Sequence, residues 1–492
     1  MPVGNSPRGA VRGASIGGEA RPRRRSSTQD ARESSLACIM QKEPRHSAHG
    51  PSRPGEARRR RLAARLCCIA LIAGSGACSP EPDPARDTRN LTLVALDGAT
   101  WRVMDPLLAA GELPNVAALI ARGCRGRLES LRISSSARIW TTMATGVIPA
   151  VHGIRDFTHQ VRGERRLFTS RDVRVPRIWE LASDAGVAVG VTNWWFTYPT
   201  APVNGFVISD HAIPSRSERA NRVHSAVGTP TPDPDALVYP SELWAEFDDL
   251  RLNPPPTPRQ RLGSYATRQA YIIEDIRRED EQVLELALRG AAAHAPRFRL
   301  VYFKGVDRAS HRFWRAYEPD HPSFADAPPV PGDVDRYADA VPDSYRNGDR
   351  LLGRLIEDAG EDAVVILVSD HGFEAADAGS ANSGTHGISE ASIDGVYAMA
   401  GGPIAAQGCP AEISIYDVAP TALYLLGVRI PGHMKGEVPP DLFAPGYLAA
   451  NPVEWTDPIA ASTRSEEAPP ADAVEAERIE RLRALGYFED SE

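Results

Sequence analysis

The sequence predicts an α/β fold built on a buried, mainly parallel β-sheet. Apolar runs of strand length occur at residues 91–96, 187–192 and 363–369, and segments with helical spacing of apolar residues separate them. Continuous apolar runs are typical of parallel strands that are covered on both faces. The chain has 492 residues, 42% hydrophobic and 24% charged, which suffices for one large domain with additions or for two domains. Its formal net charge of −8 argues against nucleic acid as a general or structural partner.

The N-terminal part of the chain has the composition of a targeting region. Residues 1–61 are rich in Arg, Ser, Pro and Gly, so we expect them to be disordered. One interpretation is a basic tract that binds nucleic acid. The interpretation that we favour is that these residues lie upstream of the true start of translation, for which Met40 is a candidate. Residues 62–78 hold a short apolar run and small residues after four arginines, the pattern of a signal peptide.

The end of this signal peptide resembles a bacterial lipobox, Gly76-Ala77-Cys78, in which the cysteine is acylated. Residues 79–89 are polar and proline-rich, as expected of a linker. We therefore expect an exported protein, either periplasmic or a lipoprotein anchored to a bacterial membrane through Cys78.

Two further cysteines, Cys124 and Cys409, follow Cys78. They could form a disulfide in an oxidising compartment. Because 285 positions separate them, they define no disulfide framework, and two buried free thiols are the preferred expectation.

The first apolar run ends in Asp97-Gly98, where a parallel strand brings its side chains to the carboxyl edge of a sheet. An ordinary turn aspartate is the alternative.

After a helical segment and a strand at residues 126–131, a helix of about two turns is predicted to begin near Ser136, with a serine at its N-cap. The helix N-terminus favours negative charge there, although a structural cap is the commoner use of serine. Because Asp97 and Ser136 follow successive strands, they can be spatial neighbours.

The strand at residues 187–192, which follows a helix at 178–185, leads to Trp194 and Trp195. These side chains either line a substrate pocket or pack in the core. Residues 211–295 are predicted to form a cap insertion, proline-rich at first and then an amphipathic helix. Residues 446–492 read as an acidic tail with a terminal helix.

Carboxylate and imidazole side chains follow two later strands. The strand at residues 299–305 leads to Asp307 and His311, whose side chains share one face if a helix begins at Asp307. A solvated ion pair is the alternative. The most strand-like run, at residues 363–369, ends in Asp370 and His371, followed by a glycine that lets the backbone turn sharply.

A loop histidine, His386 between Thr385 and Gly387, completes a candidate metal site. Its members are Asp97, Ser136, Asp307, His311, Asp370, His371 and His386. Mixed carboxylate and imidazole ligands suit zinc or a similar divalent ion, and seven groups suffice for two ions. Two ions about 4 Å apart can hold the attacking and leaving oxygens of a phosphoryl displacement. One of them would lower the pKa of the Ser136 hydroxyl and make it a nucleophile.

The order of these residues resembles the alkaline phosphatase superfamily, and within it the type I phosphodiesterase/nucleotide pyrophosphatase family. The resemblance covers roughly residues 90–440, within the segment that we assign as the catalytic domain, residues 90–445. The matching segments are Leu96-Asp97-Gly98, Ser136 with Trp140-Thr141-Thr142 and His152-Gly153-Ile154, Val306-Asp307 with His311-Arg312-Phe313-Trp314, Ser369-Asp370-His371-Gly372, Thr385-His386-Gly387 and Asp417-Val418-Ala419-Pro420-Thr421.

The resemblance implies a central, mainly parallel sheet sandwiched by helices, with a cap insertion. It also implies two metal ions, usually zinc, with manganese as the alternative. One ion would be bound by Asp307, His311 and His386. The other would be bound by Asp97, Asp370 and His371 together with Ser136.

Two positions depart from the nucleotide pyrophosphatases, which use a threonine nucleophile and an asparagine three residues later. Here these positions are Ser136 and Ile139, which argues against nucleotide substrates. Arg138 could contact the phosphoryl group instead, or point to solvent. Ser134 and Ser135 are rival nucleophiles, but the spacing to the Thr-Gly pair at the end of the helix favours Ser136.

We therefore expect a hydrolase of phosphoric esters, acting on diesters in preference to monoesters, with a small molecule, lipid or glycan as substrate. The first alternative is a transferase that moves a phospho-headgroup between lipids or glycans. The second is a non-catalytic binding protein on the same fold. A sulfatase ranks low because the chain lacks a Cys/Ser-x-Pro-x-Arg motif at Ser136.

Overall fold

The computed structural model describes residues 89–132, 135–161, 163–213, 234–247, 249–250, 265–377, 379–380, 382–387 and 389–460. The predicted signal peptide and lipobox lie outside these residues, as do Ser134 and the predicted helix near the C-terminus. Within the described residues, no single helix is long and apolar enough to span a membrane, although α2 (Trp101–Ala109) and α3 (Pro114–Ala121) together have the length and composition of a bent pair.

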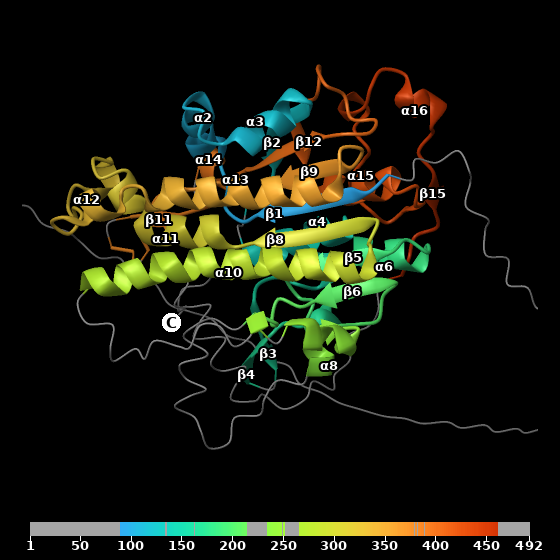
Figure 1. The fold of residues 1–492 in the computed structure, drawn as a ribbon, viewed down its shortest axis with the longest axis horizontal. Coiled ribbons are helices and arrows are strands. Elements are labelled where there is room, and N and C mark those ends of the chain that lie inside the picture. Colours follow the sequence, from blue (N-terminus) through green and yellow to red (C-terminus); the bar gives the residue numbers. More distant parts are fainter. Residues whose placement is uncertain are drawn as a thin grey trace, which may run out of the picture. The chain divides into compact units, whose positions relative to one another are not determined.

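Within the described residues, nine strands form a central mixed sheet (Figure 1). Their order across the sheet is β13 (Glu412–Ser414), β2 (Gly123–Glu129), β12 (Gly395–Ala400), β9 (Val364–Val368), β1 (Leu91–Leu96), β8 (Phe298–Phe303), β5 (Val189–Thr192), β6 (Gly205–Ile208) and β7 (Val238–Tyr239). The run from β9 to β6 is parallel throughout, and β12 and β7 are antiparallel to their neighbours. The predicted mainly parallel sheet is confirmed.

Alternation of side chains along each strand divides the core into two layers. In β1, Leu91, Leu93 and Ala95 belong to one buried cluster, whereas Val94 and Leu96 belong to the other. The first cluster includes buried side chains of α4 (Ser136–Thr145), α6 (Ile178–Asp184) and α15 (Val418–Leu425). The second includes those of α10 (Tyr265–His294), α11 (Gly305–Tyr317) and α13 (Ala340–Ala359), three helices that lie side by side over one face of the sheet in Figure 1. Helices therefore cover both faces of the sheet, as the sequence predicted.

Shorter elements complete the fold. The described short strands are β3 (Thr158–Val161) with β4 (Glu164–Leu167), β10 (Glu374–Ala375) with β11 (Gly384–Thr385), and β14 (Ile430–Pro431) with β15 (Trp455–Thr456). The described short helices are α5 (Pro149–His152), α8 (Pro234–Leu237), α12 (Asp333–Tyr337), α14 (Glu390–Ile393) and α16 (Tyr447–Ala450). The pairing of β15 with β14 extends the ordered fold past residue 445, the boundary predicted for the catalytic domain.

Two features of the sheet differ from the sequence prediction. The antiparallel strand β12 lies between β2 and β9, so Asp97 after β1 and Ser136 after β2 do not follow neighbouring strands. The helix α10, which belongs to the predicted cap insertion, packs on the sheet beside α11 and α13, and β7 adds an edge strand. Whether residues 211–295 act as a cap stays a prediction.

The two cysteines of the domain form a disulfide, so the expectation of two free thiols is wrong. Cys124 lies near the start of β2, and Cys409 lies in the loop that returns to β13, with 5.7 Å between their Cα atoms. Because β13 pairs with β2, the chain that approaches β13 must pass the first residues of β2. A disulfide is typical of proteins in oxidising compartments, which agrees with the predicted export.

Candidate metal centre

Asp97 and Ser136 meet at the carboxyl edge of the sheet. Asp97 follows β1 directly, and Ser136 is the first residue of α4. The Ser136 hydroxyl lies 3.5 Å from Oδ1 of Asp97 and 3.2 Å from Nε2 of His371, and all three side chains are buried. The N-cap position belongs to Ser135, whose hydroxyl donates to Oδ1 of Asp156 at 3.1 Å. The hydroxyl of Ser136 therefore faces the cluster and does not cap its helix.

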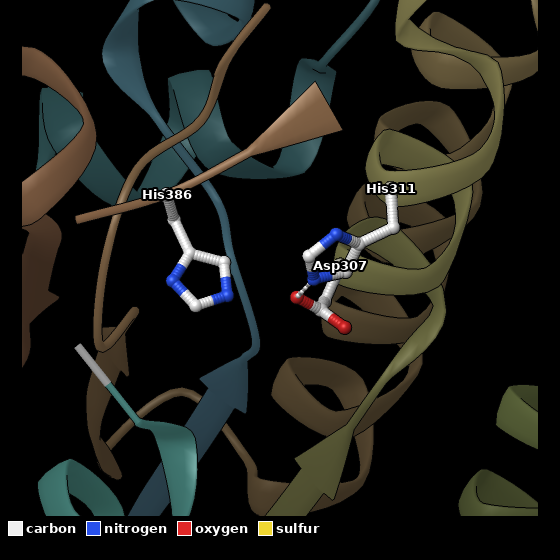
Figure 2. A group of neighbouring side chains, drawn as sticks. All are labelled: Asp307, His311 and His386. Carbon is white, nitrogen blue, oxygen red and sulfur yellow. Dashed lines mark ion pairs between the residues drawn. The ribbon is translucent and has the colours of Figure 1, made fainter. Parts of the chain in front are cut away.

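Asp307 and His311 lie one turn apart on α11 and point toward the loop that carries His386 (Figure 2). Nε2 of His311 is 3.4 Å from Oδ1 of Asp307, and the His311 and His386 ring centroids are 5.1 Å apart. The helix begins at Gly305, two residues before the predicted start, without changing the i, i+4 relation. The backbone N–H of Ser383 donates to the His311 carbonyl, which holds the His386 loop against α11.

Asp370 and His371 follow β9 and join the two groups. The Gly98 N–H donates to Oδ1 of Asp370 at 3.2 Å. Nε2 of His371 lies 3.3 Å from Oδ2 of Asp370 and 3.6 Å from Oδ1 of Asp97. The His371 ring also stacks on the His386 ring, with 3.8 Å between centroids. All six charged or imidazole residues predicted for the metal site are therefore brought together.

Hydrogen bonds to backbone carbonyls determine which ring nitrogens face the cluster. Nδ1 of His371 lies 3.1 Å from the Gly372 carbonyl, and Nδ1 of His311 lies 3.0 Å from the Gly384 carbonyl. Because a carbonyl oxygen can only accept, each Nδ1 carries a proton and donates it. In the neutral ring, Nε2 then presents a lone pair to the cluster, the arrangement that metal-ligating histidines use.

The carboxyl groups of the cluster are difficult to ionise together. Burial, reinforced by the nearby Asp370 and Asp307, raises the pKa of Asp97 well above its usual range. Burial also raises the pKa of Asp370 to about 7. Carboxylates that are buried side by side need a compensating positive charge, which a proton or a cation can supply.

The three histidines cannot all be protonated, so they do not supply all of the compensating positive charge. Burial lowers the pKa of His371, and burial with the neighbouring His371 and His311 lowers the pKa of His386 well below its usual value. Burial also opposes the charged form of His311, but Asp307 outweighs it and raises the pKa of this ring. Neutral Nε2 lone pairs beside carboxylate oxygens are suited to a cation between them. The residues present therefore fit divalent metal ions.

Two overlapping groups have ligand atoms within 4.8 Å of one another: Asp307 with His311 and His386, and Asp97 with Asp307 and His371. The first group is the one that the family resemblance implied. The second contains Asp307 where the resemblance implied Asp370. Asp307 thus lies between the two groups.

The three predicted substrate-contacting residues occupy different environments. Trp194 is 1% exposed and packs edge-on against Trp140 and Trp179, as a core side chain does. Trp195 is 7% exposed, and its ring packs edge-on against Phe157 and Tyr302. Arg138 is half-buried and donates to the Arg155 carbonyl at 3.0 and 2.6 Å. Contact of these residues with substrate stays a prediction.

Three residues beside the cluster were not predicted. The Tyr302 hydroxyl donates to Oδ2 of Asp97, and Trp140 Nε1 donates to Oδ1 of Asp97 at 3.5 Å. The ammonium group of Lys304 lies 3.9 Å from the ring centroid of Trp195. A tyrosine near the end of β8 and a lysine directly after this strand were the available signals, but neither pointed to Asp97.

The fold and the cluster define an α/β protein with a candidate metal centre at the carboxyl edge of its sheet. The family model "Type I phosphodiesterase / nucleotide pyrophosphatase" matches residues 91–421 of the chain. The chain belongs to this family of phosphoric-ester hydrolases, which confirms the resemblance found in the sequence. No curated protein sequence matches the chain.

Several solved structures are similar in fold. Phosphonoacetate hydrolase from Sinorhizobium meliloti 1021 is 19% identical, with a TM-score of 0.35, and the match covers 58% of this chain and 57% of that chain. Murine ectonucleotide pyrophosphatase/phosphodiesterase 5 is 13% identical over 72% of this chain and 100% of that chain, with a TM-score of 0.42. Phosphonate monoester hydrolase from Silicibacter pomeroyi is 17% identical over 73% of this chain and 78% of that chain, with a TM-score of 0.43.

Proposed function

We propose that this protein hydrolyses phosphoric diesters, with Ser136 as the nucleophile. The observation that carries the proposal is the position of the Ser136 hydroxyl, 3.5 Å from Asp97 and 3.2 Å from His371 at the N-terminus of α4. A helix N-terminus stabilises negative charge, so the phosphoryl group of a substrate bound there would face favourable partial charges.

Two divalent ions, zinc in preference to manganese, complete the proposed site. Asp307, His311 and His386 would hold one ion, and Asp97, Asp370 and His371 with the Ser136 oxygen would hold the other. Bound ions supply positive charge for the phosphoryl oxygens and lower the pKa of the Ser136 hydroxyl. The group of Asp307, His311 and His386 supports the first ion, and Asp97 with His371 supports the second. Asp370 is assigned to the second ion because its Oδ2 lies 3.3 Å from Nε2 of His371.

In the proposed reaction, the Ser136 oxygen forms a bond to phosphorus while the bond from phosphorus to the leaving oxygen breaks. The leaving group departs as an alcohol with the proton from the serine hydroxyl. Water then attacks the phosphoryl group on Ser136, releases the monoester and restores the hydroxyl. Asp97 and Ser136 are buried, so the serine oxygen makes few hydrogen bonds to solvent that would compete with its attack on phosphorus.

We also propose that the protein is exported and attached to a bacterial membrane through an acylated Cys78. The signal-peptide pattern at residues 62–78 supports this proposal, and the disulfide between Cys124 and Cys409 is compatible with it. A periplasmic or membrane location would give the site access to phosphate esters of small molecules, lipids or glycans.

The function is tested with bis(4-nitrophenyl) phosphate as substrate in the presence of zinc or manganese. We expect the wild-type protein to release 4-nitrophenolate, and Ser136→Ala to lower kcat by at least about 10³-fold because the nucleophile is removed. Ser135→Ala is the matched control and should keep kcat within about tenfold of wild type, since its hydroxyl bonds to Asp156.

Retention of activity in Ser136→Ala would disprove the serine nucleophile. If the metal-loaded wild-type protein hydrolyses no diester, the alternative of a non-catalytic binding protein on the same fold would be favoured. A headgroup transferred to an added lipid or glycan acceptor, instead of to water, would indicate the transferase.

A further inference from the structure

The register of the sheet brings the side chain of Tyr302 to Asp97. In the parallel pairing of β1 with β8, Ala95 lies opposite Tyr302. The N–H of Asp97 continues this ladder and donates to the Phe303 carbonyl at 3.0 Å. Ala95 and Asp97 are two positions apart, so their side chains point to the same face of the sheet. A long side chain opposite Ala95 therefore reaches Asp97, and the Tyr302 hydroxyl donates to Oδ2 of its carboxylate.

The indole of Trp195 determines the direction of that hydrogen bond. Nε1 of Trp195 lies 2.5 Å from the hydroxyl oxygen of Tyr302. An indole N–H can only donate, so the tyrosine oxygen accepts this bond and directs its own proton to Asp97. All three side chains are buried, where hydrogen bonds in series strengthen one another. The donors therefore run in one direction, from Trp195 to Tyr302 to Asp97.

The backbone around Trp195 is held by contacts of its neighbours. The side-chain amide of Asn193 donates to the Tyr302 carbonyl at 2.9 Å, and Nη1 of Arg177 donates to the Phe196 carbonyl at 2.8 Å. Phe196 has a φ of 58°, in the left-handed region that bulky residues rarely adopt. Such a conformation persists where the surrounding structure over-determines it. The fold therefore fixes the position from which Trp195 reaches Tyr302.

The two carboxylate oxygens of Asp97 have different surroundings. Oδ1 lies 3.5 Å from the Ser136 hydroxyl and 3.6 Å from Nε2 of His371, the groups that we assign to the second ion. Oδ2 accepts the bond from Tyr302. Hydrogen bonds to a ligating carboxylate orient it toward its ion. Asp97 is therefore arranged to offer one oxygen, Oδ1, to a cation.

The number of oxygens that Asp97 offers affects which ion fits. With Oδ1 alone, the group assigned to the second ion has four donors, namely this oxygen, the Asp370 carboxylate, Nε2 of His371 and the Ser136 oxygen. Four donors suit zinc, which proteins commonly bind in a four-coordinate site. Manganese favours six ligands that are mostly oxygens, so an additional carboxylate oxygen would favour it.

We propose that Trp195 and Tyr302 are positioning residues that reserve Oδ2 of Asp97, so that Asp97 binds its ion through one oxygen and the site prefers zinc to manganese. Trp195 acts through Tyr302, a role that needs no contact with substrate. The inference rests on the metal site of the proposed function, but it does not depend on which ester the protein hydrolyses.

The test measures the manganese and zinc dissociation constants of the full-length protein by competition with a chelator. Trp195→Phe keeps an aromatic ring and removes the N–H donor, so the ratio of the manganese constant to the zinc constant should fall at least about threefold. Tyr302→Phe removes the bond to Oδ2 itself and should lower the ratio by about tenfold or more. Trp179→Phe is the matched control, because Trp179 is another buried indole of this aromatic cluster, in contact with Trp194, and it should leave the ratio unchanged.

Two further readouts separate positioning from a general loss of stability. In the cobalt-substituted protein, visible absorption weakens as the number of ligands rises, so it should be weaker in Trp195→Phe and Tyr302→Phe than in the wild type. In the double variant, Trp195→Phe should change the ratio by less than about twofold beyond Tyr302→Phe, because its effect passes through the tyrosine hydroxyl. A substitution that only destabilises the fold would have the same effect in both backgrounds.

The outcomes separate this inference from the proposed function. Equal ratios in Trp195→Phe and Trp179→Phe, or full additivity with Tyr302→Phe, would overturn the role of Trp195. If Trp195→Phe fails to fold, Tyr302→Phe decides, and an unchanged ratio and cobalt spectrum would overturn the inference. If the protein binds no ion, the proposed metal site fails and the inference fails with it. If the ratios change as expected while no diester is hydrolysed, the inference stands and the proposed hydrolysis fails.

Discussion

The side chain of Tyr302 connects the aromatic core with the candidate metal centre. Its hydroxyl donates to Oδ2 of Asp97 and accepts from Nε1 of Trp195 at 2.5 Å. Trp140 donates to the other oxygen of Asp97, so both carboxylate oxygens are oriented by aromatic residues. Hydrogen-bond partners of a metal-ligating group orient it and tune its affinity for the ion.

Tyr302→Phe should therefore weaken binding of the ion next to Asp97 by about tenfold or more. The change is measured as the zinc dissociation constant in competition with a chelator. Tyr397→Phe is the matched control, because Tyr397 is also buried and donates to the Pro410 carbonyl without touching the cluster. Equal loss of zinc affinity in the two variants would show that Tyr302 acts only through general stability.

Metal content tests the cluster itself. We expect about two zinc-like ions per chain in the purified protein and fewer in both Asp97→Ala and His386→Ala, because each variant removes a ligand of a different group. The measurement is elemental analysis after dialysis, with His433→Ala, outside the cluster, as the control. A folded protein that binds neither zinc nor manganese would contradict the two-metal proposal.

At the level of elements, the position of α11 depends on a residue of α10. The buried carboxylate of Asp280 accepts from the N–H groups of Lys304 and Gly305, at 3.2 and 3.1 Å. The N-cap residue Lys304 makes no side-chain capping bond, so Asp280 takes over that function from a different helix. Because α11 carries Asp307 and His311, the contact between α10 and α11 places two of the six charged or imidazole residues of the cluster.

Gly305→Ala should disturb this contact. A Cβ atom at Gly305 would lie 2.1 Å from Oδ2 of Asp280, whose two hydrogen bonds hold it in place, so the helix or the carboxylate must move. We expect a loss of about 1–3 kcal/mol in the free energy of unfolding, measured by denaturant titration. We also expect weaker zinc binding, since Asp307 moves with the helix.

Gly348→Ala on α13 is the control for this substitution. A Cβ atom there would lie 3.4 Å from the Leu96 side chain, an ordinary packing distance. Because alanine also has the higher helix propensity, this variant should be neutral or more stable by up to about 1 kcal/mol. If both variants are equally stable, close packing at Gly305 does not control α11.

For the whole molecule, the carboxyl and amino ends of the parallel strands carry different features. Asp97 and Asp370 lie at the carboxyl ends of the parallel strands β1 and β9, where the candidate metal centre is assembled. Cys124 lies near the amino end of β2, which runs in the same direction as β1 because β12 is antiparallel to both β2 and β9. The disulfide therefore joins chain segments at the opposite edge from the metal centre.

Reduction of this disulfide should destabilise the fold more than it alters the site. We expect the free energy of unfolding to fall by about 2–5 kcal/mol with reductant, because the bond closes a long loop of the unfolded chain. Cys124→Ser should show the same loss without reductant and no further change with it. Zinc affinity of the folded protein should stay within about threefold. A wild-type stability that is unaffected by reductant would contradict the prediction.

Much of the fold and the candidate site could be predicted because their signals are local. Apolar runs that end in polar residues identified β1, β8 and β9, together with the side chains at their carboxyl ends. The i, i+4 spacing of Asp307 and His311 also survives a two-residue error in the helix start. The antiparallel strand β12 was missed although its six residues are all buried, because an apolar run does not reveal its direction or its neighbours.

By itself, the sequence determined the family, the mainly parallel sheet and the set of residues at its edge, because short-range patterns and motif order carry that information. Only the tertiary structure decided the contacts between distant segments. These include the disulfide across 285 positions, the Asp307 shared by both ligand groups, the bond from Tyr302 to Asp97, and the capping of α11 by Asp280. Such contacts depend on strand order and helix packing, and residues far apart in the chain carry no local signal of which partner they will meet.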